Sequence, residues 1–442
     1  MFKTLKNAWK IADLRKKLLY TLGMLLLYRF LCFVPTPGVD TATVASQVNR
    51  YSILNYISIM TGSNFQNYTI MAMGITPYIN SSIIMQLLCV AIPSLEALSK
   101  QGEEGREKIA KITRYVTVGL GFFQAIALTI GLKADANGSF FSLITIGFCL
   151  AAGTALAMWI GERIDKNGIG NGVSMLIMAG IISRFATSFA TGVYTQFSEF
   201  FKGSQIINEA GTAVVGYDTS FAGRFGSLPG HLAVIIISLI MIVGVVLVDM
   251  AERRIPVQYA KRMVGRKMYG GQSTHIPLKL NASGVLPLIF ASAIMQFPET
   301  ILTLVGASKA SSWWTDHLGY STWWYIAIQA VLILGFTFFY SAITFNPKDM
   351  AENVQSNGGL IPGIRQGKQT VDYITKINSR ITLFGAIFLA VLSLIPSIIY
   401  KIAGVQIAFA GSSLLIAVSV AVETARALEA QMLQRHYKGF LK

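Results

Sequence analysis

Charged residues are scarce in this sequence. They make up 13% of its 442 residues, whereas hydrophobic residues make up 53% and the mean hydropathy is +0.54. A typical soluble domain carries about 25% charged residues, so this composition excludes an ordinary soluble protein. Apolar stretches of about twenty residues recur along the whole chain, and each could cross a hydrocarbon core of roughly 30 Å. The composition therefore predicts an all-α polytopic membrane protein.

The residues and motifs of enzymes are equally scarce. The sequence has four histidines, none with a metal-ligand partner at helical spacing, and no Gly-rich loop ending in Lys-Ser/Thr. Its cysteines are odd in number and widely spaced, which gives neither a disulfide framework nor a metal site. We expect them to be small buried hydrophobic residues: Cys32, Cys89 and Cys149. The sequence thus predicts no catalytic residue, no metal and no cofactor.

The apolar stretches also hold almost no Asp, Glu or Lys near their middles. Ion-coupled carriers usually keep such charges inside the membrane, so their absence argues against a proton-driven or sodium-driven carrier. The polar residues there are neutral: Asn80, Ser82, Gln86, Gln124, Asn281, Ser292 and Gln296. They favour either ordinary interhelical hydrogen bonds, worth about 1 kcal/mol or less each, or a seam that can open.

One interrupted apolar stretch occurs twice. Gly74–Gln86 reads GITPYINSSIIMQ, and 210 residues later Gly284–Gln296 reads GVLPLIFASAIMQ, with seven of thirteen positions identical. Interrupted hydrophobic segments at matching places in two halves indicate the working interface of a transport protein. The alternative is that the small residues merely let helices pack closely.

The hydrophobic pattern predicts ten transmembrane helices. Their approximate ranges are 18–34, 74–92, 112–132, 140–160, 169–189, 232–248, 282–302, 323–343, 381–400 and 407–425. With the amino end inside, the inside segments carry 29 Lys and Arg and the outside loops carry seven. This bias predicts that both termini are cytoplasmic. The repeat is then inverted, with a half of five helices at 1–190 and another at 191–442.

Two cytoplasmic loops, about 249–280 and 345–380, are long and basic. Their most prominent basic residues are Arg253, Arg254, Lys261, Arg262 and Arg365. Such charge is typical of cytoplasmic loops in general. It could also bind RNA phosphates or an acidic protein surface. The outside loop 198–230 is mixed in composition, and we expect an irregular or hairpin-like cap.

Five motifs in the right order resemble the SecY family, whose members form the centre of the bacterial protein-conducting channel. They are GEEGREKIA at 102–110, GIGNG at 168–172, YAKR at 259–262, QSTHIPLK at 272–279 and PGIR at 362–365. The similarity covers nearly the whole chain. It implies an hourglass pore between two inverted five-helix halves, clamped by SecE and accompanied by SecG.

The resemblance also implies roles for single residues. The family's apolar pore ring corresponds to Ile79, Ile83, Val173, Ile177, Ile289 and Ile416. Its plug corresponds to about 57–71, with Ile57, Met60, Gly62, Phe65 and Met71. Its lateral gate corresponds to the second and seventh spans, flanked by the third and eighth. The gate residues here are Gly74, Pro77, Ser82, Gln86, Gln124, Asn281, Pro287 and Ser292, with Gln124 and Asn281 as its polar cluster.

The function so implied is a passive channel in the bacterial plasma membrane. It would pass unfolded secretory polypeptides across and release signal sequences and other apolar segments sideways into lipid. The basic loops would dock the SecA ATPase and the ribosome, mainly through Arg254, Lys261 and Arg365. The alternative is a secondary carrier for a small solute built on the same repeat. An intramembrane hydrolase would need a nucleophile–base pair or a metal site in the spans, and this sequence has neither there.

Overall fold

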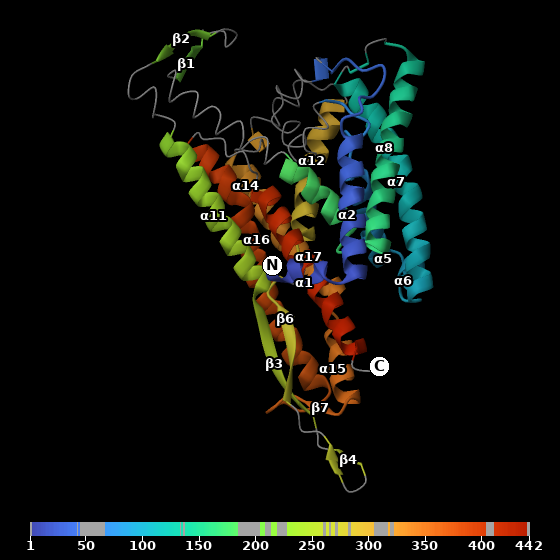
Figure 1. Ribbon diagram of the computed structural model, residues 1–442, viewed down its shortest axis with the longest axis vertical. Coiled ribbons are helices and arrows are strands. Elements are labelled where there is room, and N and C mark those ends of the chain that lie inside the picture. Colours follow the sequence, from blue (N-terminus) through green and yellow to red (C-terminus); the bar gives the residue numbers. More distant parts are fainter. Residues whose placement is uncertain are drawn as a thin grey trace.

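The computed structural model is mostly helical, with its long helices running roughly along one axis (Figure 1). It describes residues 2–41, 43–44, 67–132, 134–135, 138–183, 204–207, 214–218, 228–259, 262–264, 267–269, 273–281, 284–304, 317–318, 322–403 and 411–439. In Figure 1 the amino end lies near the middle of the molecule beside α1, and the carboxyl end lies lower, beside α15. The prediction that the two termini share one side of the membrane stays a prediction.

Each of the ten predicted spans overlaps a helix of the described chain. The amino-terminal half contains α1 (Phe2–Trp9), α2 (Ala12–Leu31), α5 (Thr76–Ala91), α6 (Pro93–Ser99), α7 (Glu103–Gly131), α8 (Phe140–Asn167) and a helix at Gly172–Ser183. The other half contains α11 (Leu228–Met250), α12 (Leu286–Leu304), α14 (Trp323–Thr344), α15 (Pro347–Ser356), α16 (Lys368–Ala403) and α17 (Gly411–Gly439).

By length and apolar composition, four helices within the described residues could cross a membrane, and a fifth if the bent pair α5–α6 counts as one span. Three shorter apolar helices lie at Gly172–Ser183, Leu239–Met250 and Leu286–Met295. The count of ten spans therefore remains a prediction. The α5–α6 bend of 106° follows from Pro93, because the residue before a proline avoids helical geometry. Ile92 accordingly has an extended ψ of 114°.

The two basic loops contain β-strands that the sequence analysis did not predict. β3 (Glu252–Tyr259) and β6 (Ser273–Lys279) form an antiparallel hairpin, and β7 (Gly359–Leu360) pairs with the other edge of β3. Beyond this sheet, β4 (Arg262–Val264) pairs with β5 (Lys267–Tyr269). In the outside loop, β1 (Ser204–Ile207) pairs antiparallel with β2 (Val214–Asp218), as a hairpin-like cap would.

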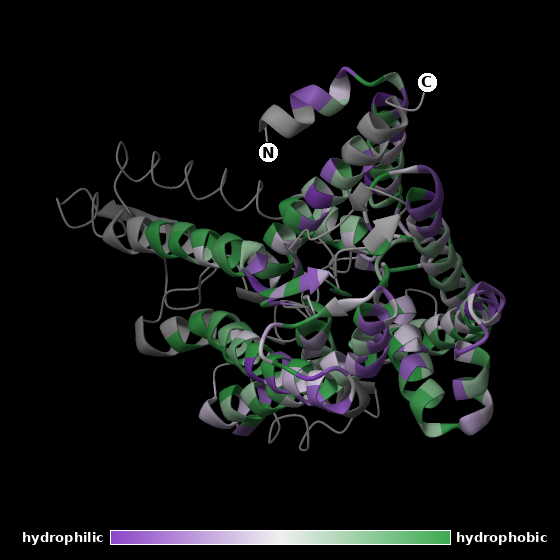
Figure 2. Ribbon diagram, turned by 90° about the horizontal axis from the view of Figure 1, so that it is seen from below, coloured by the Kyte–Doolittle hydropathy of each residue, from purple (hydrophilic) through white to green (hydrophobic). Residues whose placement is uncertain are grey.

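The helices pack in the same relation in both halves. α7 packs against α5 and α8, and the corresponding α14 packs against α12 and α16. The halves also meet, because α7 contacts α12 and α1 contacts α17. Seen from the end that carries the β3–β6 hairpin, the bundle helices are largely hydrophobic and hydrophilic residues concentrate in the nearer elements (Figure 2). Of the three cysteines, Cys32 is buried as predicted, whereas Cys89 and Cys149 are partly exposed, so the prediction that they are buried is wrong.

Candidate functional site

The repeated stretch has the same local structure in both halves. Gly74 and Gly284 have left-handed φ angles of 52° and 62°, which glycine adopts without the steric cost that other residues incur. Two residues later the helices begin, α5 at Thr76 and α12 at Leu286. Each has proline as its second residue, where a missing N–H costs no hydrogen bond. In both segments, therefore, the glycine and proline that interrupt the apolar stretch form the start of a helix.

Side-chain exposure repeats as well. Met85 and Met295 are 4% and 5% exposed, whereas the preceding Ile84 and Ile294 are 40% and 42% exposed. The two segments share one pattern of exposure although they are 210 residues apart. α5 and α12 thus present the same face to their surroundings, as an inverted repeat requires.

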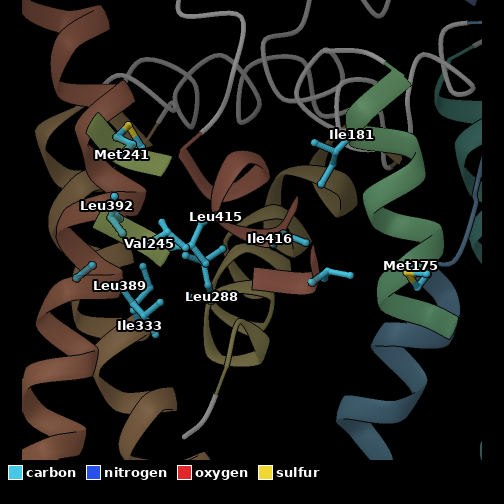
Figure 3. Close-up of a cluster of buried hydrophobic side chains, with 13 residues drawn as sticks. Met175, Ile181, Met241, Val245, Leu288, Ile333, Leu389, Leu392, Leu415 and Ile416 are labelled. Atoms are coloured by element: carbon cyan, nitrogen blue, oxygen red, sulfur yellow. The ribbon is translucent and has the colours of Figure 1, made fainter. Parts of the chain in front are cut away.

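Five of the six predicted ring residues pack in two hydrophobic clusters, and one of the five contacts both clusters. Ile79, Val173 and Ile177 pack against the first cluster, which includes Tyr28, Cys32 and Ile160. The second cluster contains Ile416, and Ile177 and Ile289 pack against it. In Figure 3, Ile416 lies between Leu288 and the helix that carries Met175 and Ile181. Ile177 belongs to both clusters, so side chains from the two halves meet there. The sixth ring residue, Ile83, is buried on α5.

The gate residues are mostly buried or half-buried. Pro77 and Pro287 are buried, and Gln86 donates to the hydroxyl of Ser82 at 3.4 Å. Ser292 is 5% exposed, and its hydroxyl has no hydrogen-bond partner within the described chain. α12 contacts α7, which places the seventh span against the third.

The predicted polar cluster is arranged differently. Gln124 is half-buried on α7, whereas Asn281 donates from Nδ2 to Oδ1 of Asp249 at 2.8 Å. No hydrogen bond joins Gln124 and Asn281 in the part of the chain that the structure describes. Sequence reasoning missed Asp249, whose only signal was a lone carboxylate at the end of an apolar span.

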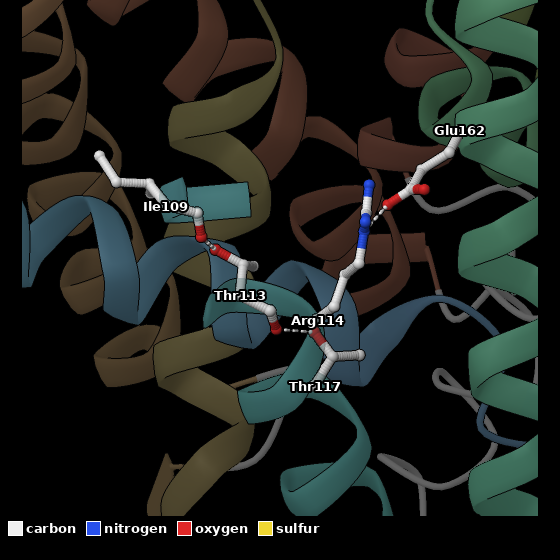
Figure 4. Close-up of polar contacts among 5 residues, drawn as sticks. All are labelled: Ile109, Thr113, Arg114, Thr117 and Glu162. Carbon is white, nitrogen blue, oxygen red and sulfur yellow. Dashed lines mark hydrogen bonds and ion pairs between the residues drawn. The ribbon is translucent and has the colours of Figure 1, made fainter. Parts of the chain in front are cut away.

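Sequence reasoning also missed a polar contact between α7 and α8. Arg114 and Glu162 form an ion pair at 2.6 Å, with both side chains partly exposed (Figure 4). On the same stretch of α7, the hydroxyls of Thr113 and Thr117 donate to main-chain carbonyls four residues earlier. These threonines thereby satisfy their own polar groups, which suits a helix in an apolar environment. The pair shows that charges near span ends are matched across helices.

The predicted plug lies largely outside the described residues. Ile57, Met60, Gly62 and Phe65 are not among them. Met71 is fully buried beside Tyr28 and Ile160. Just before it, Thr36 N donates to Tyr68 O at 3.2 Å and Ile70 N donates to Val34 O at 3.0 Å. The end of the predicted plug segment is therefore bonded to the chain that follows α2.

Three of the predicted docking residues lie on one packed body, formed by β3, β6, α15 and the start of α16. Arg253 and Arg254 are exposed on β3, and Arg254 pairs with Glu252 at 2.8 Å. Arg365 is exposed in the turns that follow β7. One hydrophobic core holds β3, β6, α15 and the start of α16 together: Ile255, Val257, Leu278, Ala351, Val354, Ile361 and Ile374. Arg262 lies in β4, and Lys261 lies outside the described residues.

Comparison with known proteins gives consistent results. The family model for SecY matches residues 69–425. The protein named protein translocase subunit SecY from Halalkalibacterium halodurans is 41% identical over 453 residues, and the one from Bacillus subtilis is 39% identical over 455. Both alignments cover the whole of each chain.

Solved structures match the fold. A structure described as a protein conducting channel superposes with a TM-score of 0.63 at 19% identity, covering 95% of this chain and 92% of the other. Sec61 in the canine ribosome-channel complex superposes with a TM-score of 0.59 at 17% identity and the same coverage. The predicted family and the helical channel fold are thus confirmed.

Proposed function

This chain belongs to the SecY family, and on that premise we propose that it is the central subunit of a protein-conducting channel. It passes unfolded secretory polypeptides across the membrane and releases hydrophobic segments into lipid through a lateral gate. Full-length relatives at about 40% identity carry the name protein translocase subunit. The observation that carries the proposal is the pair of matched helix starts at Gly74 and Gly284, one in each half, together with the contact of α7 with α12 between the halves.

The pore ring closes the channel by apolar contact. All six of its side chains are β-branched and stiff at χ1, so a ring of them has a fixed shape. It offers ions and water no hydrogen bonds, and a narrow apolar constriction of this kind can exclude water. Polypeptides of any sequence can still displace it because hydrophobic contact is non-directional. The shared contact of Ile177 with both hydrophobic clusters supports this role.

The lateral gate is the boundary between the halves along α5 and α12, flanked by α7 and α14. A signal sequence that reaches this boundary meets lipid and partitions by its hydrophobicity. The contact of α7 with α12 supports the assignment. The hydroxyl of Ser292 also supports it, because this hydroxyl has no hydrogen-bond partner among the described residues. An interface with few strong polar contacts is easier to open repeatedly. The plug, about 57–71, would seal the pore from the outside.

The channel works with partners in the bacterial plasma membrane. SecE and SecG complete the membrane complex, and the chain itself catalyses no reaction. SecA, which hydrolyses ATP, or the translating ribosome supplies the energy. Both dock on the cytoplasmic body, through Arg253, Arg254, Lys261, Arg262 and Arg365. A Sec61 structure in a ribosome-channel complex has the same fold, which supports the ribosome as a docking partner.

The test is reconstitution of the purified chain with SecE, SecG and SecA in lipid vesicles. A secretory precursor added outside becomes protected from protease when ATP is present, and the same precursor without its signal sequence stays sensitive. A solute carrier on the same fold would instead give saturable flux of a small molecule without SecA. Failure of the complete complex to protect the precursor would contradict the proposed function.

A further inference from the structure

Asp249 is the hydrogen-bond centre of the cytoplasmic end of the second half. It is the penultimate residue of α11, and its Oδ1 accepts from Asn281 Nδ2 at 2.8 Å. Its other carboxylate oxygen accepts from the hydroxyl of Ser419. Its main-chain carbonyl accepts from Arg426 at 2.6 Å. One residue thus joins α11, α17 and the segment that leads into α12.

These bonds are stronger than average for physical reasons. Hydrogen bonds to an ionised carboxylate are shorter and roughly twice as strong as neutral ones. A cation such as Arg426 is stabilised at the carboxyl end of α11, where unpaired carbonyls carry partial negative charge. Asn281 Oδ1 is buried without a partner in the described chain, so the bond to Asp249 is what holds its amide.

Of the described residues between β6 and α12, Leu280, Asn281 and Gly284 are each held by a contact. Leu280 N donates to Ala251 O at 3.1 Å, which continues the pairing of the β3–β6 hairpin beyond its last residues. Gly284 N then donates to Asn281 O at 3.4 Å. α16 packs directly against this connection, because a Cβ on Gly385 would lie 2.8 Å from Leu280 O. Asn281 is therefore held on several sides immediately before the helix start.

We propose that Asp249 is a positioning residue of the lateral gate. It fixes the cytoplasmic start of α12 to α11 and α17, so that α12 moves only together with its own half. Opening then has to separate α12 from α7, and a strong signal sequence is needed to drive this separation. Without Asp249, α12 shifts within its half and the gate opens for weaker signals. This inference rests on the proposed channel function.

The experiment compares two precursors in cells: one with a full signal sequence and one whose signal has a shortened apolar core. We expect Asp249→Ala to increase export of the weak-signal precursor several-fold and to leave the strong-signal precursor unchanged. Asn281→Asp should also increase export of the weak-signal precursor, because it places two carboxylates side by side. Combining Asp249→Asn with Asn281→Asp restores an amide–carboxylate pair with exchanged positions, and parental discrimination should return.

The matched control is Asp372→Ala, which removes an exposed carboxylate on α16 outside this cluster and should leave discrimination unchanged. If Asn281→Asp does not accumulate, Asn281→Ala takes its place, since it also removes the donor. Parental discrimination in Asp249→Ala, or no return of discrimination in the exchanged pair, would overturn the inference. Failure of the parent to export even the strong-signal precursor would instead contradict the channel function.

Discussion

Gly153 and Gly119 lie in the neighbouring helices α8 and α7, and they differ in what a methyl group would meet. At Gly153 a Cβ would lie 1.9 Å from the carbonyl oxygen of Ile70, a backbone atom that cannot rotate away. At Gly119 a Cβ meets nothing within 4 Å. The glycine in α8 therefore lets the chain before α5 approach that helix closely, whereas the glycine in α7 has no such role.

We predict that Gly153→Ala lowers the thermal unfolding midpoint of the purified complex, because either Ile70 or α8 has to move. Gly119→Ala makes the same chemical change and should be neutral or stabilising, since alanine is favoured over glycine in a helix interior by about 0.5–1 kcal/mol. Thermal unfolding of both variants in the same detergent checks this. Equal midpoints would show that the Gly153 contact does not constrain the fold.

At this scale the sequence predicts what a local pattern encodes. The repeat predicted matching interrupted segments in the two halves, and the structure gives them matching φ angles and matching exposure at Met85 and Met295. It could not identify partners that are distant in the chain. Asp249 and Asn281 are 32 residues apart, and Arg114 and Glu162 are 48 apart. Such pairs depend on helix placement, which no local spacing determines.

Among the elements, the β6–β3–β7 sheet unites the two basic loops. Gln258 pairs with Leu360 and Tyr259 with Gly359, so the turn that carries Arg365 is attached to the hairpin that carries Arg254. Two loops that are separate in sequence thus present their basic residues from one packed body. A docking partner would contact both together.

We predict that Arg365→Glu impairs SecA-driven export while the complex with SecE and SecG still assembles. Arg365 is exposed, so the change reverses a surface charge without removing core packing. Precursor protection with SecA and ATP measures activity, and co-purification of the subunits measures assembly. Lys100→Glu, the same charge reversal at the end of α6, serves as the matched control and should export normally. Normal export by Arg365→Glu would refute this role.

The sheet could have been predicted only in part. β3 alternates a buried Ile255 and Val257 with an exposed Pro256, which is the pattern of a half-buried strand. A strand needs a partner, however, and β7 has only two residues and lies a hundred positions further on. Only the charge of these loops was used in the prediction from sequence. The short apolar alternation within them, which determines the strands, was overlooked.

For the whole molecule, we predict that both termini and the β3–β6–β7 body face the cytoplasm. Ser139 precedes α8 and Asn357 follows α15, and both are exposed. In a variant without its three native cysteines, a membrane-impermeant maleimide should label Ser139→Cys in intact spheroplasts and Asn357→Cys in inverted vesicles. Labelling after detergent treatment checks that both thiols react. Reaction of both positions from one side would contradict the predicted topology.

The arrangement of the whole molecule was more predictable than its interfaces. Hydropathy placed a span on each of ten helices, because a membrane demands long apolar segments whatever their neighbours are. Helix boundaries were less accurate: α7 begins nine residues before its predicted span, and α16 begins thirteen residues before its span. Both extensions are polar and continue the helix beyond the apolar span. Hydropathy does not distinguish helix from loop in such polar segments.

The pairing of β3 with β7 has a consequence for synthesis. Ribosomes make β3 and β6 well before residues 359–360, so for that interval the outer edge of β3 has unpaired N–H and C=O groups. An open edge of this kind is a template for wrong pairing. A nascent chain that has not yet reached residue 359 therefore exposes an unpaired edge of β3 that can pair with a wrong strand.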